Sequence, residues 1–150
     1  MKRKTLTTDA CNEMKKIRED EIQSTQQNLM EACILGNPAI VSRVVQVPGL
    51  DINYQDESGG TAALWACING RTECVRILAE TDRVDWNKAD SEGVTPLFCS
   101  LEEGHSDIVD IIVQQPNIDY NVKTEDGDTL AHAAAIGGNV KCVECCSREF

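Results

Sequence analysis

The chain has 150 residues, enough for one domain of ordinary size, and its 41% hydrophobic and 26% charged residues are typical of a folded protein. This composition excludes an intrinsically disordered chain, and the aromatic content of only 4% requires a core of small aliphatic side chains. The formal net charge of −11 argues against general nucleic-acid binding, because an acidic surface repels phosphate groups.

The sequence contains no signal for a membrane or for secretion. No apolar run approaches the roughly 20 residues that a membrane-spanning helix needs. The N-terminus begins Met1-Lys2-Arg3-Lys4 and is basic, but no apolar stretch follows it, so a secretory signal peptide is not indicated. We therefore expect a cytoplasmic protein, or alternatively a nuclear one, that binds neither membranes nor nucleic acids.

Residues 1–24 are predicted to form an N-terminal extension that is helical or flexible. Met14, Ile17 and Ile22 hint at a weakly amphipathic helix over residues 9–24. Such a helix would pack on the first repeat, remain a solvated extension, or end a longer coiled segment, and it is too short to establish heptads. We favour the capping role.

Residues 25–150 repeat at an interval of 34 residues. Asp51, Asp85 and Asp119 mark the period, and each is followed by a large apolar residue and then by asparagine. A fixed period of this length predicts a solenoid, in which similar units stack against their neighbours. The units cover about residues 25–58, 59–92, 93–126 and 127–150, and the last is incomplete or uncapped.

Each of the last three units begins with a glycine turn and a threonine, and is predicted to contain two short helices. The glycine tolerates a positive φ, the threonine hydroxyl can cap the first helix, and Pro96 fits its first turn. The first helix ends at another glycine, and the second carries an apolar stripe with i, i+1, i+3, i+4 spacing. The turn glycines are Gly59, Gly93 and Gly127, the threonines are Thr61, Thr95 and Thr129, and the terminal glycines are Gly70, Gly104 and Gly138.

The first unit is degenerate. It lacks the threonine and the turn glycine, although Gly36 and the pairs Ile40-Val41 and Val44-Val45 keep the period. Terminal repeats are atypical because one of their faces meets solvent. We therefore interpret this unit as an N-terminal cap.

Three segments of the later units share one pattern: Gly93-Val94-Thr95-Pro96-Leu97, Gly104-His105 and Ile108-Val109. They resemble the ankyrin repeat, and Thr129 with His132 keeps part of this pattern in unit four. The resemblance covers residues 25–150 and implies an all-α solenoid of about four repeats, with stacked helix–turn–helix units and projecting β-hairpin loops. It further implies protein binding on the concave side, and hydrogen bonds from His132 to backbone groups of neighbouring repeats.

The eight cysteines invite a metal or disulfide interpretation, but most occupy core positions of the repeat. Cys142, Cys145 and Cys146 resemble a CxxC element, yet they fall where isoleucines lie one unit earlier, and free cysteine fills a core well. The same register assigns three more cysteines to the core: Cys33, Cys67 and Cys74. Cys11 and Cys99 stay unassigned. A redox or metal-sensing module at the C-terminal cysteines is the less favoured alternative to a binding function.

The sequence holds no catalytic constellation. His105 and His132 both occupy structural positions of the repeat, and no serine or cysteine is matched with a histidine and an acid outside that explanation. A phosphate-binding loop is also missing. We predict no enzymatic activity, no cofactor and no bound metal.

Partner-binding residues are expected at equivalent surface positions of successive units. The hairpin tips form an acidic edge that would attract basic side chains, and its members are Asp56, Glu57, Asp90, Glu92, Glu125 and Asp126. Family geometry implies two further positions on the concave side, and these hold Trp65 and Cys99, then Ile68, Glu102 and Ile136. Trp65 either anchors a partner or packs on its neighbouring repeat.

These features predict a non-catalytic protein–protein interaction module, an adaptor or scaffold. It would bind a basic or amphipathic segment of another protein through the hairpin tips and the concave inner-helix face. An architectural role within a longer ankyrin array is the alternative. The fourth unit would leave its apolar stripe without a polar cap, so self-association through this unit is also expected.

Overall fold

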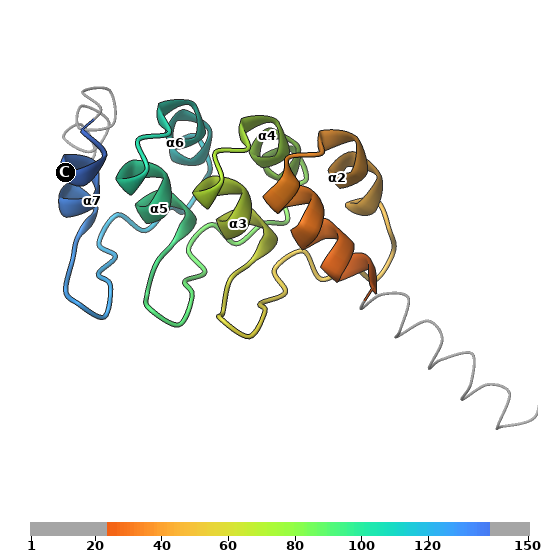
Figure 1. Ribbon diagram of the computed structural model, residues 1–150, viewed down its shortest axis with the longest axis horizontal. Coiled ribbons are helices and arrows are strands. Elements are labelled where there is room, and N and C mark those ends of the chain that lie inside the picture. The colour runs from red at the N-terminus through yellow and green to blue at the C-terminus, as the bar shows by residue number, and fades with distance from the viewer. Residues whose placement is uncertain (1–23, 139–150) are drawn as a thin grey trace, which may run out of the picture.

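The computed structural model describes residues 24–138, which form a row of helix pairs (Figure 1). Apart from an isolated antiparallel bridge between Lys123 and Thr129, the described residues contain no strand. The helices are a segment over residues 24–35, α2 (Pro38–Val44), α3 (Ala62–Ile68), α4 (Thr72–Glu80), α5 (Pro96–Glu102), α6 (Ser106–Val113) and α7 (Leu130–Gly137). The predicted all-α solenoid of stacked helix pairs is therefore confirmed.

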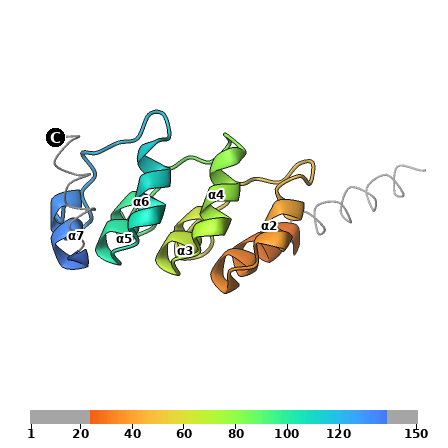
Figure 2. The same ribbon diagram turned by 90° about the horizontal axis from the view of Figure 1, so that it is seen from above.

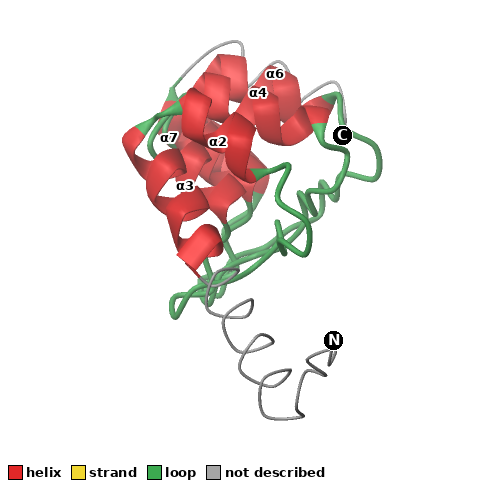
Figure 3. Ribbon diagram, turned by 90° about the vertical axis from the view of Figure 1, so that its right-hand side faces the viewer, coloured by secondary structure: helices red, strands yellow, loops and turns green. Residues whose placement is uncertain are grey.

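The helix pairs follow one another in sequence order, and their connecting loops all project from the same side of the stack (Figures 1 and 2). Viewed along the stack, the helices gather above and the loops below (Figure 3). The segment 24–35, α3, α5 and α7 are the first helices of the four units. The predicted extension up to residue 23 and the second helix of unit four, with Cys142, Cys145 and Cys146, lie outside the described residues.

Threonine begins three of the first helices, as predicted. The buried Thr61 accepts a hydrogen bond from the backbone N–H of Leu64 at 3.2 Å, and Thr95 accepts one from Phe98 at 3.3 Å. Pro96 is buried at the first position of α5, where a helix needs no backbone donor. These caps fix the angle at which each loop enters its helix.

Unit four begins its helix with a different cap. The backbone N–H of Thr129 donates to Nδ1 of His132 at 3.1 Å, and the Thr129 hydroxyl lies 2.8 Å from the same nitrogen. We expected His132 to form hydrogen bonds with backbone groups of neighbouring repeats. The hydrogen bonds that the structure describes for His132 join it instead to Thr129 of its own unit, so the expectation is wrong for these bonds. The side chain at the third position of a helix can reach back to the backbone N–H of the N-cap residue, which explains the bond between His132 and Thr129.

Gly70 ends α3 in a left-handed conformation with φ +67°. Its N–H donates to the carbonyl of Cys67 at 3.3 Å, and that of Arg71 donates to Ala66 at 2.9 Å, which is the Schellman arrangement. A Cβ at Gly70 would also lie 2.8 Å from the ring of His105 in the next unit. This glycine therefore serves both the helix end and the packing between units.

Small side chains build a core that runs continuously through the stack. Leu64, Leu78, Leu101, Ile108 and Ile112 are each at most 1% exposed. Burial of one such side chain stabilises a fold by about 1.5–3 kcal/mol, so a few aliphatic residues per unit make up most of the core, to which the aromatic residues Trp86 and Phe98 also belong.

The loops of successive units are hydrogen-bonded to one another. The backbone N–H of Ser91 donates to the carbonyl of Ser58 at 3.1 Å, and that of Glu125 donates to Glu92 at 2.9 Å. Each hairpin tip is therefore attached to the tip of the next unit, and the tips follow one another in a row.

An asparagine side chain makes a second connection between units. Nδ2 of Asn53 donates to the carbonyl of Arg83 at 3.0 Å, and the N–H of Asp85 donates to Oδ1 of Asn53 at 2.7 Å. Asn87 repeats both bonds one unit later, at 2.7 and 2.8 Å. One side chain thus binds a donor and an acceptor of the following backbone, which sets the register between units.

We expect Gly59→Ala to destabilise the protein more than Gly127→Ala. Both glycines have a positive φ, +80° and +85°, so both substitutions carry the same backbone cost of about 1–2 kcal/mol. A Cβ at Gly59 would lie 2.8 Å from the backbone nitrogen of Ser91, whereas one at Gly127 would have no atom of residues 24–138 within 4 Å, apart from its chain neighbours. The clash should add about 1–3 kcal/mol at Gly59. Urea unfolding followed by circular dichroism measures both losses, and equal losses would contradict the packing of hairpin on hairpin.

Candidate partner-binding surface

An open depression of about 780 Å³ lies between the helical segment 24–35 and the first hairpin loop. Apolar and acidic side chains both line it. We call this depression the groove, and its residues are Gln27, Met30, Glu31, Ile34, Tyr54, Asp56, Glu57, Ser58 and Trp65.

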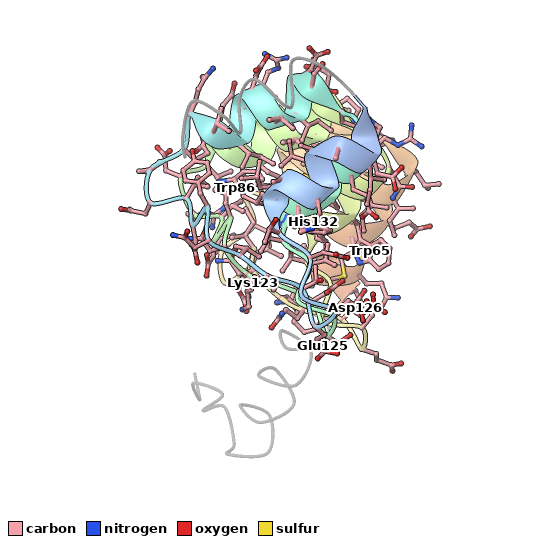
Figure 4. All side chains as sticks on the ribbon, turned by 90° about the vertical axis from the view of Figure 1, so that its left-hand side faces the viewer. Trp65, Trp86, Lys123, Glu125, Asp126 and His132 are labelled. Atoms are coloured by element: carbon pink, nitrogen blue, oxygen red, sulfur yellow. The ribbon has the colours of Figure 1, made fainter. Side chains whose placement is uncertain are left out.

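Trp65 forms one wall of the groove and is half-buried. Its indole Nε1 donates to Oδ2 of Asp56 at 2.8 Å, and a Cβ at Gly60 would lie 2.7 Å from the same nitrogen. The indole thus lies against its own hairpin loop and leaves part of its surface to the groove. Trp65 lies on the side of the hairpin tips, represented by Glu125 and Asp126, and Trp86 lies on the opposite side (Figure 4).

Asp56 organises the loop that supports this tryptophan. Its Oδ1 accepts from the backbone N–H of Ser58 at 3.0 Å, from the Ser58 hydroxyl at 2.6 Å and from the N–H of Gly60 at 2.9 Å. Partial burial alone would raise the pKa of Asp56, but the hydrogen bonds from Ser58, Trp65 and Gly60 outweigh it, so the pKa falls below its ordinary value of 3.8. Asp56 is therefore an anionic acceptor at neutral pH.

Asp90 has the same role one unit later, where Oδ1 accepts from the backbone N–H of Glu92 at 2.9 Å and of Val94 at 3.0 Å. Asp56 and Asp90 are both only partly exposed. Both carboxylates therefore hold their own turns, and the assignment of Asp56 and Asp90 to a partner-binding acidic edge stays a prediction. The exposed acidic side chains at the tips are Glu57, Glu92, Glu125 and Asp126.

The inner helices present an uneven row of side chains. Ile136 is 63% exposed, while Ile68 and Glu102 are partly exposed. Cys99 is only 3% exposed and lies in the core of α5, so its prediction as a partner-binding residue is wrong. The small thiol, unlike the indole of Trp65 at the equivalent position, fits between neighbouring inner helices.

Two apolar residues of the groove, Met30 and Ile34, were not predicted from the sequence. Ile34 is 38% exposed and occupies the position equivalent to Ile68, so the 34-residue register carried the signal that would have found it. No such signal exists for Met30, because the equivalent residue of unit two is Leu64, which is buried.

The four described cysteines are free and buried: Cys33, Cys67, Cys74 and Cys99. Burial raises the pKa of the Cys33 thiol, and the neighbouring Cys74 and Cys67 raise it further. Burial likewise raises the pKa of Cys74 and of Cys99, which suppresses the reactive thiolate. The predicted core role of these residues is confirmed for the first three and extends to Cys99.

Residues 24–138 contain no group of three or more histidine, cysteine or acidic side chains arranged to hold a metal ion. Over the same residues, no helix has both the length and the apolar character to cross a bilayer.

A comparison with protein-family models matches residues 29–124 to the model for ankyrin repeats in three copies. The chain belongs to the ankyrin repeat family. A search of curated proteins found no significant match. Ankyrin repeats are generally protein–protein interaction modules, and the family is typically non-enzymatic. The candidate surfaces for a protein ligand are the groove and the tip row, which consists of the exposed tip residues Glu57, Glu92, Glu125 and Asp126.

Replacement of Asp56 should loosen Trp65 in this ankyrin repeat. We expect Asp56→Asn to destabilise the fold by about 1–2 kcal/mol at neutral pH, because a charged acceptor of four hydrogen bonds is lost. Since the folded pKa lies below 3.8, this stabilisation is present above pH 3.8 and is lost as pH falls through the folded pKa. The difference in urea stability between variant and wild type should therefore shrink at low pH.

Tryptophan fluorescence provides the control for this experiment. The difference spectrum between wild type and Trp65→Phe isolates Trp65 from Trp86, which is 6% exposed. The fluorescence emission of Trp65 obtained in this way should shift to longer wavelength in Asp56→Asn. A loss of stability that stays constant from pH 7 to pH 2.5 would contradict the assigned role of the carboxylate.

The buried thiols should resist alkylation in the native ankyrin stack. We expect iodoacetamide at pH 8 to leave Cys33, Cys67, Cys74 and Cys99 unlabelled for times that label them fully in urea, because burial removes the access of the reagent to all four. At Cys33, Cys74 and Cys99 the raised pKa also lowers the amount of reactive thiolate. Peptide mapping by mass spectrometry resolves each cysteine. Labelling of Cys99 at the rate of an unfolded chain would show that it does reach the surface.

Proposed function

We propose that the chain is a non-catalytic adaptor or scaffold module that binds a segment of another protein in the groove and along the hairpin tips. The observation that carries this proposal is the groove itself, where the half-buried Trp65 lies beside Met30 and Ile34 and below an acidic loop. Aromatic side chains in partly desolvated depressions are the usual anchors of protein interfaces.

The chemistry of the groove specifies a basic, amphipathic ligand. An apolar side chain of the ligand would contact the free part of the Trp65 indole together with Met30 and Ile34. A neighbouring lysine or arginine would face Glu57 and Glu31, which are exposed at the rim. The excess of negative charge over the whole chain, −11, supports the same choice because it raises the association rate of cationic ligands.

The tip row extends this surface beyond the groove. Glu92, Glu125 and Asp126 are exposed and belong to tips that are hydrogen-bonded in series, so the row is supported by backbone contacts rather than by single loops. A ligand that continues past the groove would meet one or two carboxylates in each unit. Screening by salt should then weaken the outer contacts first, because they are the most exposed.

We also propose a cytoplasmic or nuclear location, since buried free thiols suit a reducing compartment. The alternative role, an architectural part of a longer ankyrin array, would not use the groove. The two roles therefore differ in whether Trp65 affects binding.

The proposal is tested with ligands selected from a random peptide library on the full chain. Selected sequences should combine lysine or arginine with leucine or an aromatic residue. Trp65→Ala should weaken binding about 30-fold, equivalent to about 2 kcal/mol at an interface anchor. Glu57→Gln with Glu92→Gln should slow association several-fold at low salt and little at high salt. Calorimetry and surface plasmon resonance measure the two effects.

A matched control removes the same charge elsewhere. Glu73→Gln with Glu80→Gln neutralises two exposed carboxylates on α4, the second helix of unit two, and should leave association unchanged. If this pair slows binding as much as the tip pair, only net charge matters. If Trp65→Ala binds every selected peptide normally, the groove is not the site and the architectural role is favoured.

A further inference from the structure

The first helices of units one to three carry two sets of equivalent positions that lie one helical turn apart, because residues three apart on a helix are neighbours on its surface. The first set is Glu31, Trp65 and Cys99, and the second is Ile34, Ile68 and Glu102. The helical segment 24–35, α3 and α5 follow one another in the stack, so the two sets form two parallel rows across three units (Figure 1). We call these six positions the paired rows.

Within the described residues, five of the six side chains reach the surface. Glu31 is exposed and Ile34 is 38% exposed. Trp65, Ile68 and Glu102 are partly exposed, and the thiol at the remaining position is buried. Trp65 and Ile68 belong to unit two, which has a unit on either side, so their exposure does not depend on an end of the stack.

Part of the paired rows already forms one surface in the groove. Glu31, Ile34 and Trp65 all line the groove, although they come from two units. Ile68 follows Trp65 by one turn on α3 and is equivalent to Ile34, so it extends this surface toward unit three. The surface then reaches Glu102 near the end of α5.

An apolar centre lies between two carboxylates on this surface. Trp65 and Ile68 form the centre in unit two, while Glu31 lies on the side of unit one and Glu102 on the side of unit three. Within residues 24–138, the carboxylate of neither glutamate has a hydrogen-bond or ion-pair partner. Both carboxylates are therefore available to cations of a ligand, one at each side of the apolar centre.

The spacing of the units limits the conformation of a ligand that contacts all three. Packed helices lie about 8–10 Å apart, so two carboxylates that are two units apart are separated by roughly 20 Å along the stack. In an α-helix, about seven residues make two turns and span about 10 Å, so every seventh residue meets the next unit with the same face. A β-strand does not match, because residues about three apart, which cover 10 Å, point to opposite faces.

The width of the paired rows separates an α-helix from a polyproline helix. A polyproline helix also repeats every 9 Å or about three residues, but it offers one side chain per turn to a surface. The two rows are about 5 Å apart, which is one turn of the helix that carries them. The apolar stripe of an amphipathic α-helix is about 100° wide or more, so it contacts both rows at once.

We propose that the paired rows bind an amphipathic α-helix of another protein, which lies along the stack and crosses the first helices of units one to three. Its apolar residues contact Trp65 and Ile68. A lysine or arginine about seven residues to either side pairs with Glu31 or with Glu102. This inference rests on the proposed function, whose ligand it specifies as a helix with basic residues about fourteen positions apart. The charge of the two free carboxylates on either side of the apolar centre carries the choice of ligand.

A peptide library on an alanine-rich helical host tests this register, with the full chain as the target. Positions on one face of the host are randomised among leucine, lysine, glutamate and glutamine. Selected peptides should hold leucine at the centre and lysine about seven positions before and after it. Circular dichroism should show more helix in the mixture of peptide and protein than in the two measured separately.

Charge reversal at one end of the paired rows gives the sharpest outcome. Selection on Glu102→Lys should replace one of the two lysines of the peptides by glutamate and keep the other, and selection on Glu31→Lys should do the opposite. Peptides selected on the wild type should bind each variant several-fold more weakly, because an exposed ion pair becomes a repulsion. This pattern also shows which end of the peptide lies over unit one.

The matched control is Glu80→Lys, which makes the same change at an exposed position of α4, the second helix of unit two. Selection on this variant should keep lysine at both positions of the peptides. Urea unfolding followed by circular dichroism checks that all three variants are folded.

Three results would overturn the inference. The first is a helical library that yields no binder, and the second is a set of binders without a preferred separation between lysines. The third is a Glu80→Lys variant that alters the selected peptides as much as the other two, because only net charge would then matter. If the random peptide library still yields binders that need Trp65, the proposed function stands and only the helical register is rejected.

Discussion

Each unit of the stack is joined to the next by an asparagine whose side chain binds the neighbouring backbone. Asn53 donates to one carbonyl and accepts from one N–H of the following unit, and Asn87 repeats the arrangement. An amide satisfies a donor and an acceptor at once only in one orientation, so these bonds determine both the spacing and the register of the units. Small aliphatic side chains are then sufficient to fill the core, because every unit meets its neighbour at the same separation.

The same register creates the proposed binding surface. Units that repeat in register place their hairpin tips in one row and their first helices in another (Figures 1 and 3). Asp56 and Asp90 both turn their carboxylates into their own loops, but within the described residues only Asp56 also accepts a hydrogen bond from a tryptophan, the Trp65 indole, at 2.8 Å. The neighbouring carboxylate of Glu57 remains exposed. A rigid aromatic wall beside a free acidic side chain is thus produced by one hydrogen bond.

The period of the sequence predicted the units, the threonine caps, the terminal glycines and the core cysteines, because these follow from spacing alone. It predicted less of the surface. Whether a carboxylate is free depends on which amides lie near it, and neither Asp56 nor Asp90 differs by composition from an exposed tip residue. The prediction for Cys99 failed in the opposite way, because a residue predicted at the surface is buried. Cys99 occupies the position equivalent to the partly exposed Trp65, but burial depends on side-chain size and on the helices at both sides. Equivalent positions share a backbone environment without sharing exposure.

The ends of the stack follow from the same reasoning. Ile40 and Ile108 occupy equivalent positions, yet one is 41% exposed and the other 0%, and within residues 24–138 only Ile108 has a preceding unit to cover it. Burial of such a side chain stabilises by about 1.5–3 kcal/mol, whether the covering unit belongs to the same chain or to another.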